Sequence, residues 1–132
     1  MICEETDSFV AAIPSFGALV GLDLGTVTIG VAVSDGMRSV ASPLETIKRK
    51  KFGVDAKRLL EIFAMKDVKG IVLGLPLNMD GSEGPRAQAT RSFARNLEKL
   101  TPLPITFWDE RLSTVAAERV LIEADTSRKR RA

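Results

Sequence analysis

Histidine is absent from this sequence of 132 residues, and no other gap in its composition excludes as much chemistry. Without an imidazole, the chain cannot build a Ser-His-Asp or Cys-His nucleophile, a histidine general base or a histidine-ligated zinc site. Any catalysis must therefore use carboxylates, hydroxyl groups, lysine or a bound metal ion.

Cysteine is almost as scarce, because Cys3 is the only one. The chain therefore has no internal disulfide and no cysteine-based metal site, which is typical of proteins in a reducing compartment. The longest apolar runs, such as residues 71–77, are far shorter than the roughly 20 residues that cross a bilayer. We expect a soluble, cytoplasmic protein that does not bind membranes.

Charge and the N-terminal residues give little information about partners. The 19 basic and 17 acidic residues leave a net charge of +2, so only the placement of charges can be informative. Residues 1–16 contain three acids and no Lys or Arg, unlike a secretory signal. We expect residues 1–17 to form a flexible extension and residues 18–132 to form one domain with a single core.

Apolar runs of strand length are followed by alternating helical and strand patterns. Pro43 interrupts the third run, which favours a sheet edge. The pattern predicts strands at residues 18–24, 28–34, 40–47, 70–75 and 103–108, and helices at 54–66, from Pro85 to before Pro102, and after Ser113 or Thr114. This order predicts an α/β fold with a mixed five-stranded sheet. Three antiparallel N-terminal strands precede alternating helices and parallel strands, and helices cover both faces.

Acidic residues follow two of the strands that should run parallel. Asp23 ends the first strand, and Asp109 and Glu110 follow the last one. Because the carboxyl ends of parallel strands share one edge, we expect these acids to converge there. A divalent cation would offset their mutual repulsion, and oxygen ligands favour Mg²⁺ or Mn²⁺. Two such ions about 3.5–4 Å apart can hydrolyse a phosphodiester without histidine.

Each of these features also has a purely structural explanation. Asp109 and Glu110 could interact with the N-terminal dipole of the next helix, with Arg111 as their partner. Residues 78–82 form a turn in any case, and the basic cluster at 128–131 is either a solvated tail or a site of phosphate neutralisation. We assign Phe107 and Trp108 to the core rather than to base stacking.

Several motifs occur together in a fixed order along the chain. They are residues 21–26 (Gly-Leu-Asp-Leu-Gly-Thr), 29–35 (Ile-Gly-Val-Ala-Val-Ser-Asp), 74–81 (Gly-Leu-Pro-Leu-Asn-Met-Asp-Gly) and 109–114 (Asp-Glu-Arg-Leu-Ser-Thr). With residues 124–131, this set resembles the YqgF (RuvX) family of pre-16S rRNA nucleases. The resemblance implies a ribonuclease H-like, resolvase-related fold and trimming of the 5′ end of the small-subunit rRNA precursor.

The resemblance also implies roles for individual residues. Asp23 would be the first metal ligand, and Asp109 or Glu110 the second acidic one, so the catalytic and metal-binding candidates are Asp23, Asp109 and Glu110, with Mg²⁺ or Mn²⁺ as cofactor. The candidates for binding nucleic acid are Thr26, Asn78, Arg111, Ser113, Thr114, Arg128, Lys129, Arg130 and Arg131. The family carries a further aspartate on a C-terminal helix, and we expect that helix to be missing from this chain.

Other functions stay open at this point. The expected substrate is pre-16S rRNA, with branched DNA as the alternative, and the expected state is a monomer or weak homodimer. ATPases of the actin, Hsp70 and sugar-kinase group also begin with an Asp-x-Gly-Thr turn, but they need two lobes. A non-catalytic RNA-binding module of ribosome assembly would keep the fold without cleavage.

Overall fold

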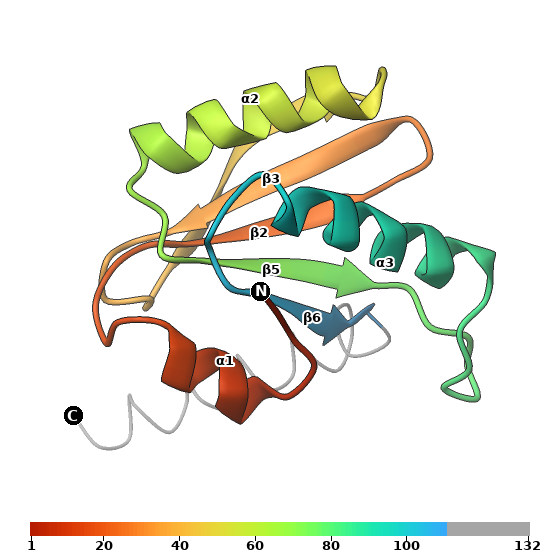
Figure 1. The fold of residues 1–132 in the computed structure, drawn as a ribbon, viewed down its shortest axis with the longest axis horizontal. Coiled ribbons are helices and arrows are strands. Elements are labelled where there is room, and N and C mark those ends of the chain that lie inside the picture. Colours follow the sequence, from red (N-terminus) through yellow and green to blue (C-terminus); the bar gives the residue numbers. More distant parts are fainter. Residues whose placement is uncertain (111–132) are drawn as a thin grey trace, which may run out of the picture.

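The computed structural model describes residues 1–110, which form a mixed sheet flanked by helices (Figure 1). Within these residues the sheet has six strands in the order β1-β6-β5-β2-β3-β4. The elements are β1 (Ile2–Cys3), α1 (Thr6–Ala12), β2 (Leu19–Leu24), β3 (Thr28–Ser34), β4 (Ala41–Lys48), α2 (Phe52–Met65), β5 (Gly70–Leu75), α3 (Pro85–Glu98) and β6 (Ile105–Asp109). The predicted helix after Ser113 lies outside the described residues.

The pairing of the strands follows the predicted mixed pattern. β2, β3 and β4 pair antiparallel, whereas β5 pairs parallel with both β2 and β6. Each parallel neighbour is reached through a helix, which returns the chain to the same end of the sheet. β4 lies at one edge, as Pro43 indicated, and its pairing with β3 shifts register between Val31 and Ala32. The fold class is confirmed, with one strand more than predicted.

α2 and α3 together cover one face of the sheet, which contains the hydrophobic core. Alternate residues of the strands point to this face, and the two helices also touch each other through the rings of Phe52 and Phe93, whose centroids lie 5.3 Å apart. The core includes Val20, Leu22, Leu24, Ile29, Val31, Leu59, Ile62, Phe63, Ile71, Leu73, Phe93, Leu97 and Ile105. The residues between them in each strand therefore point to the opposite face.

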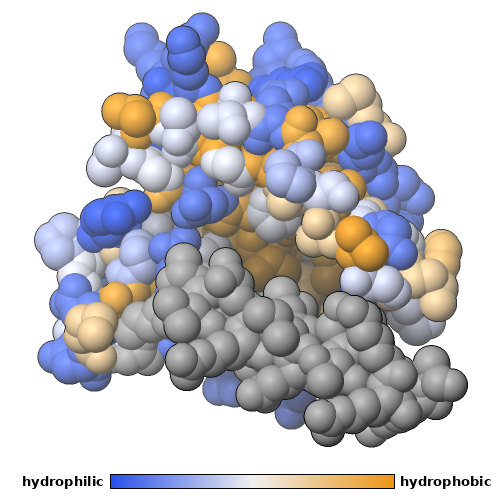
Figure 2. Space-filling model, turned by 180° about the vertical axis from the view of Figure 1, so that it is seen from behind, coloured by the Kyte–Doolittle hydropathy of each residue, from blue (hydrophilic) through white to orange (hydrophobic). Residues whose placement is uncertain are grey.

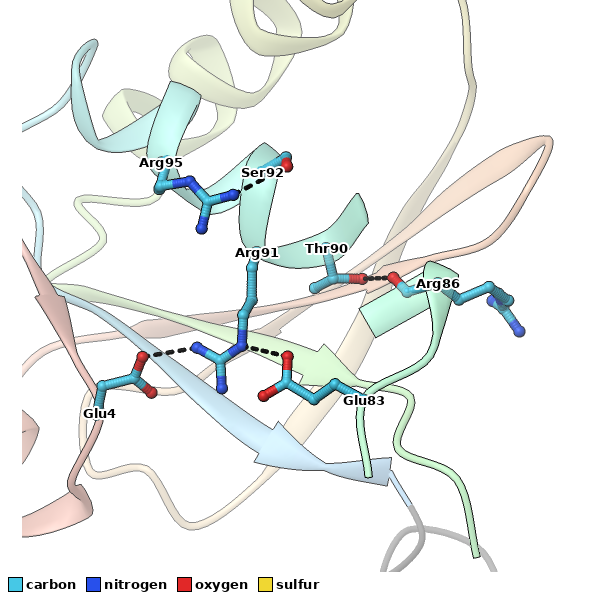
Figure 3. Close-up of polar contacts among 7 residues, drawn as sticks. All are labelled: Glu4, Glu83, Arg86, Thr90, Arg91, Ser92 and Arg95. Atoms are coloured by element: carbon cyan, nitrogen blue, oxygen red, sulfur yellow. Dashed lines mark hydrogen bonds and ion pairs between the residues drawn. The ribbon is translucent and has the colours of Figure 1, made fainter. Parts of the chain in front are cut away.

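The N-terminal residues belong to the sheet, which corrects the expectation of a flexible extension. β1 pairs parallel with β6 at the edge opposite β4. α1 lies on the face opposite α2 and α3, where Phe9 packs so closely on Gly70 that a Cβ there would be 2.7 Å from its ring. Arg91 of α3 also binds Glu4, as Figure 3 shows, and stacks on Phe107. The sequence did not indicate these contacts because they are formed with residues far along the chain.

Within residues 1–110, no helix combines the length and the apolar character that crossing a membrane requires.

Phe9 and Val10 are neighbours in α1 with opposite burial, 3% and 60% exposed respectively, and they provide a test of this packing. We expect Phe9→Ala to lower the free energy of unfolding by about 3 kcal/mol, because it removes a buried ring and leaves a cavity. Val10→Ala should change it by less than about 0.5 kcal/mol. Urea denaturation of both variants measures this difference, and equal stability would mean that α1 contributes nothing to the fold.

Candidate active site

The face of the sheet opposite α2 and α3 contains a hollow of about 710 Å³. Small residues of β2, β3 and β5 form its floor, and Figure 2, seen from behind, shows apolar surface exposed in this region. Its lining includes Gly21, Asp23, Gly30, Ala32, Pro43, Leu44, Glu45, Val72, Gly74, Trp108 and Glu110. Because the glycines have no side chains, a bulky molecule can approach the backbone of these strands closely.

Two of the predicted acids meet in this hollow. Asp23 is on the open face because its neighbours Leu22 and Leu24 point to the core. Glu110 directly follows β6, and its carboxyl group forms a side-chain hydrogen bond with Asp23. β5 lies between the two strands, and a Cβ at Gly74 would be only 2.9 Å from Cδ of Glu110. Glycine at position 74 therefore leaves the space in which the two carboxyl groups approach each other.

Glu110 does not ionise freely beside Asp23. Burial of Glu110, together with the hydrogen bond and negative charge of Asp23, raises the pKa of Glu110 to about 7. The positive charge of Arg86 lowers this pKa but does not cancel the increase. When it is protonated, Glu110 donates a hydrogen bond to Asp23.

Asp109 is not part of this pair. It pairs with Leu75 across β5 and β6, so alternation along β6 places it with Ile105 and Phe107 on the helix-covered face. It does not line the hollow. Within residues 1–110 no group of three or more His, Cys, Asp or Glu residues has the arrangement of a metal site. The acidic centre of this described region consists of Asp23 and Glu110.

The candidates for nucleic-acid binding are dispersed. Thr26 lines a second, smaller cavity beside the turn after β2. The side-chain amide of Asn78 donates to the Ser82 hydroxyl at 3.0 Å, which stabilises the loop before α3. Arg111, Ser113, Thr114, Arg128, Lys129, Arg130 and Arg131 lie outside the described residues and stay predictions.

Sequence reasoning missed three residues near the acids and misplaced a fourth. Trp108 is 48% exposed and lines the hollow, so its assignment to the core was wrong. Phe107 is partly buried against the core, as predicted. Gly74 was noted only as part of the motif at 74–81, without a role at the acids, and Arg49 and Arg86 were not singled out. The signal for Arg49 was the run of four basic residues at 48–51, whereas Gly74 and Arg86 depend on contacts that only the fold creates.

Residues 17–132 match the family model for RuvX, which is described as Holliday junction resolvase. The chain belongs to the RuvX family. This finding confirms the resemblance seen in the motifs of the sequence. A protein of Paracoccus denitrificans named "Putative pre-16S rRNA nuclease" is 71% identical over 132 residues, which are 100% of this chain and 84% of the relative. A protein of Ruegeria pomeroyi with the same name is 70% identical over 131 residues, or 99% of this chain and 85% of the relative.

Solved structures support the fold. RuvC of T. thermophilus, solved in complex with a Holliday junction substrate, has a TM-score of 0.51 and 14% sequence identity to this RuvX chain. The likeness covers 70% of this chain and 63% of the RuvC chain, which is less than two thirds of its length. At this identity the comparison shows a shared architecture, and it agrees with the resolvase-related fold that the sequence predicted.

The raised pKa of Glu110 predicts a pH-dependent stability. Its folded-state value of about 7 lies above its ordinary value of 4.5, so the folded state binds the proton more tightly than the unfolded state. This contribution is fully present below about pH 4.5 and is lost as the pH rises through 7. Above that pH the two charges repel each other.

We therefore expect Glu110→Gln, which keeps a hydrogen-bond donor but cannot ionise, to gain stability relative to the parent as the pH rises. Thermal unfolding in EDTA at about pH 5 and pH 8 tests this. Glu5→Gln, at an exposed acid, serves as the control and should show no such trend. If Glu110→Gln follows the parent at both pH values, the two carboxyl groups are not coupled.

Proposed function

We propose that this protein is a metal-dependent nuclease that hydrolyses phosphodiester bonds in the precursor of 16S rRNA. The observation that carries the proposal is the contact between Asp23 and Glu110 in an open hollow. In a chain without histidine, a carboxylate pair is the available group for this chemistry. Membership of the RuvX family and the names of the relatives support the reaction and the substrate.

The two carboxyl groups fit a divalent cation. They provide hard oxygen ligands, and burial and the negative charge of Asp23 raise the pKa of Glu110, an effect that a bound cation would oppose. When bound there, Mg²⁺ or Mn²⁺ would lower the pKa of a water molecule and stabilise charge on phosphate oxygens. Asp23 and Glu110 would hold the ion, and we no longer place Asp109 among its ligands because it lies on the other face.

The surroundings of the pair suit a polynucleotide. The glycine floor lets a sugar-phosphate backbone approach the carboxyl groups, and the half-exposed Trp108 adds an aromatic surface beside them. Pro43 and Leu44 of the edge strand form another wall of the hollow. The buried and unpaired Cys3 agrees with a cytoplasmic location, which we keep as part of the proposal.

A second candidate function is cleavage of branched DNA, because the RuvX family is described as Holliday junction resolvase. Both functions would use the same acidic pair. They differ in which substrate the surface outside the hollow selects.

Cleavage assays with Mg²⁺ or Mn²⁺ test the proposed function and separate the two candidates. We expect the protein to shorten a fragment of the 16S rRNA precursor more efficiently than it cuts a four-way DNA junction. Asp23→Asn should reduce the rate at least ~100-fold. Loss of a residue that only supports a metal ligand costs about 10- to 100-fold, and loss of the ligand itself should cost more. Glu5→Gln serves as the control and should retain activity. Absence of metal-dependent cleavage in the parent would favour a non-catalytic RNA-binding module.

The space at Gly74 gives a second test of the same pair. We expect Gly74→Ala to displace the Glu110 carboxyl group and weaken Mn²⁺ binding about tenfold, because the new methyl group would occupy its place. Gly21→Ala is a matched control on the floor of the same hollow, since a Cβ there meets no atom within 4 Å. Titration with Mn²⁺ followed by electron paramagnetic resonance measures both variants. Equal affinities would exclude Glu110 as a ligand.

A further inference from the structure

A second cavity, of about 80 Å³, lies at the carboxyl end of β2, beside the turn that follows Asp23. Its lining comes from the turn, from the residue after β4 and from the first turns of α3. The residues are Leu24, Gly25, Thr26, Arg49, Arg86, Ala89 and Thr90. We call this cavity the arginine notch, because Arg49 and Arg86 are its charged residues.

Both arginines are anchored to the same turn. Arg49 donates from Nη1 to the Gly25 carbonyl oxygen at 2.7 Å, and Arg86 donates from Nη2 to the Leu24 carbonyl oxygen at 3.3 Å. A guanidinium group has five N–H donors, so each arginine keeps several for a ligand. Two carbonyl groups of consecutive residues thus hold two positive charges close together at one small cavity.

These two arginines differ from Arg58 and Arg91, which form ion pairs with acids. Arg91 binds Glu4 and Glu83, each at 2.6 Å, and Arg58 binds Glu45 and Glu61. No ion pair between residues 1–110 includes Arg49 or Arg86. Figure 3 shows the Arg86 side chain pointing away from Arg91 and its two carboxylates. Two guanidinium groups at one cavity, neither in an ion pair with an acid of residues 1–110, favour an anion as ligand.

The size and surroundings of the notch identify the class of anion. A volume of 80 Å³ corresponds to two or three water molecules at ~30 Å³ each, which is close to a phosphate group and too small for a nucleobase. The Thr26 hydroxyl group adds a polar group of the right kind. Exposed Lys48, Lys50 and Lys51 flank Arg49, so positive charge continues along the chain between β4 and α2. Because this positive charge extends beyond the space for one phosphate group, it suits a polymer with many phosphates, such as a nucleic acid.

We propose that the arginine notch binds a backbone phosphate of a nucleic-acid strand and thereby positions that strand at the Asp23–Glu110 pair. Arg49 and Arg86 bind the phosphate oxygens, and Lys48, Lys50 and Lys51 neutralise the phosphates that follow. The turn from Asp23 to Thr26 connects the acidic pair directly to the notch, so the two sites lie within a few residues of each other. The inference rests on the proposed function for the identity of the polymer, but binding does not require cleavage.

Binding of a labelled single-stranded RNA to the full chain in EDTA tests the notch without any dependence on cleavage. We expect Arg49→Gln and Arg86→Gln each to weaken affinity about 3- to 10-fold. Each should also reduce the slope of log K against log salt concentration by about 0.7, because one phosphate contact is lost on a single strand. Arg95→Gln is the matched control, since Arg95 is exposed on α3, does not line the notch, and hydrogen-bonds to Ser92 on its own helix. Its affinity and slope should equal those of the parent.

Additional measurements distinguish the alternatives. If inorganic phosphate shifts the Nε–H resonances of Arg49 and Arg86 but both glutamine variants bind RNA with the parent's affinity and slope, the notch holds free phosphate and the proposal is wrong. If a glutamine variant fails to fold, the same RNA-binding measurement on Arg49→Lys and Arg86→Lys tests the proposal. Weaker binding with an unchanged slope supports the notch, and unchanged binding contradicts it. If the protein binds RNA through the notch but does not cleave it, the proposed nuclease function is wrong and the proposal for the notch stands.

Discussion

The contact between two carboxyl groups at the edge of the sheet imposes the strictest demands on this structure. Asp23 and Glu110 come from strands that are not neighbours, because β5 lies between β2 and β6. They can meet only if Gly74 has no side chain and if all three strands keep their register. A slip of one residue would turn either acid to the helix-covered face. Tight packing under α2 and α3 therefore maintains the register on which the acidic pair depends.

This dependence explains how the two faces of the sheet differ. The helix-covered face is filled with large aliphatic and aromatic residues, whereas the floor of the hollow contains Gly21, Gly30 and Gly74. Glycines in strands cost some stability, since they pack poorly and lose more conformational entropy on folding. The core on the other face offsets this cost. One face thus stabilises the molecule, and the hollow lies on the other.

Local patterns in the sequence were sufficient for most of the fold. The apolar runs of β2 and β3, the helical spacing in α2, and Pro85 at the start of α3 are properties of short segments, and the structure confirms each of these elements. β1 and α1 could not be predicted in this way, because Cys3 and Phe9 acquire their burial from β6 and β5. The same limit applies to the site. The acids could be placed at strand ends, but the separation of Asp109 from Glu110 depends on which face each occupies.

Pairing of β1 with β6 also has a consequence for folding during synthesis. Thr106 donates a hydrogen bond to the Cys3 carbonyl oxygen across 103 positions of the chain. β1 is synthesised before β6 and must therefore wait for that strand before it can enter the sheet. A hairpin such as β2–β3 can form early because its partners are close in sequence. The N-terminal segment thus completes the sheet only after nearly all of the described chain has been made.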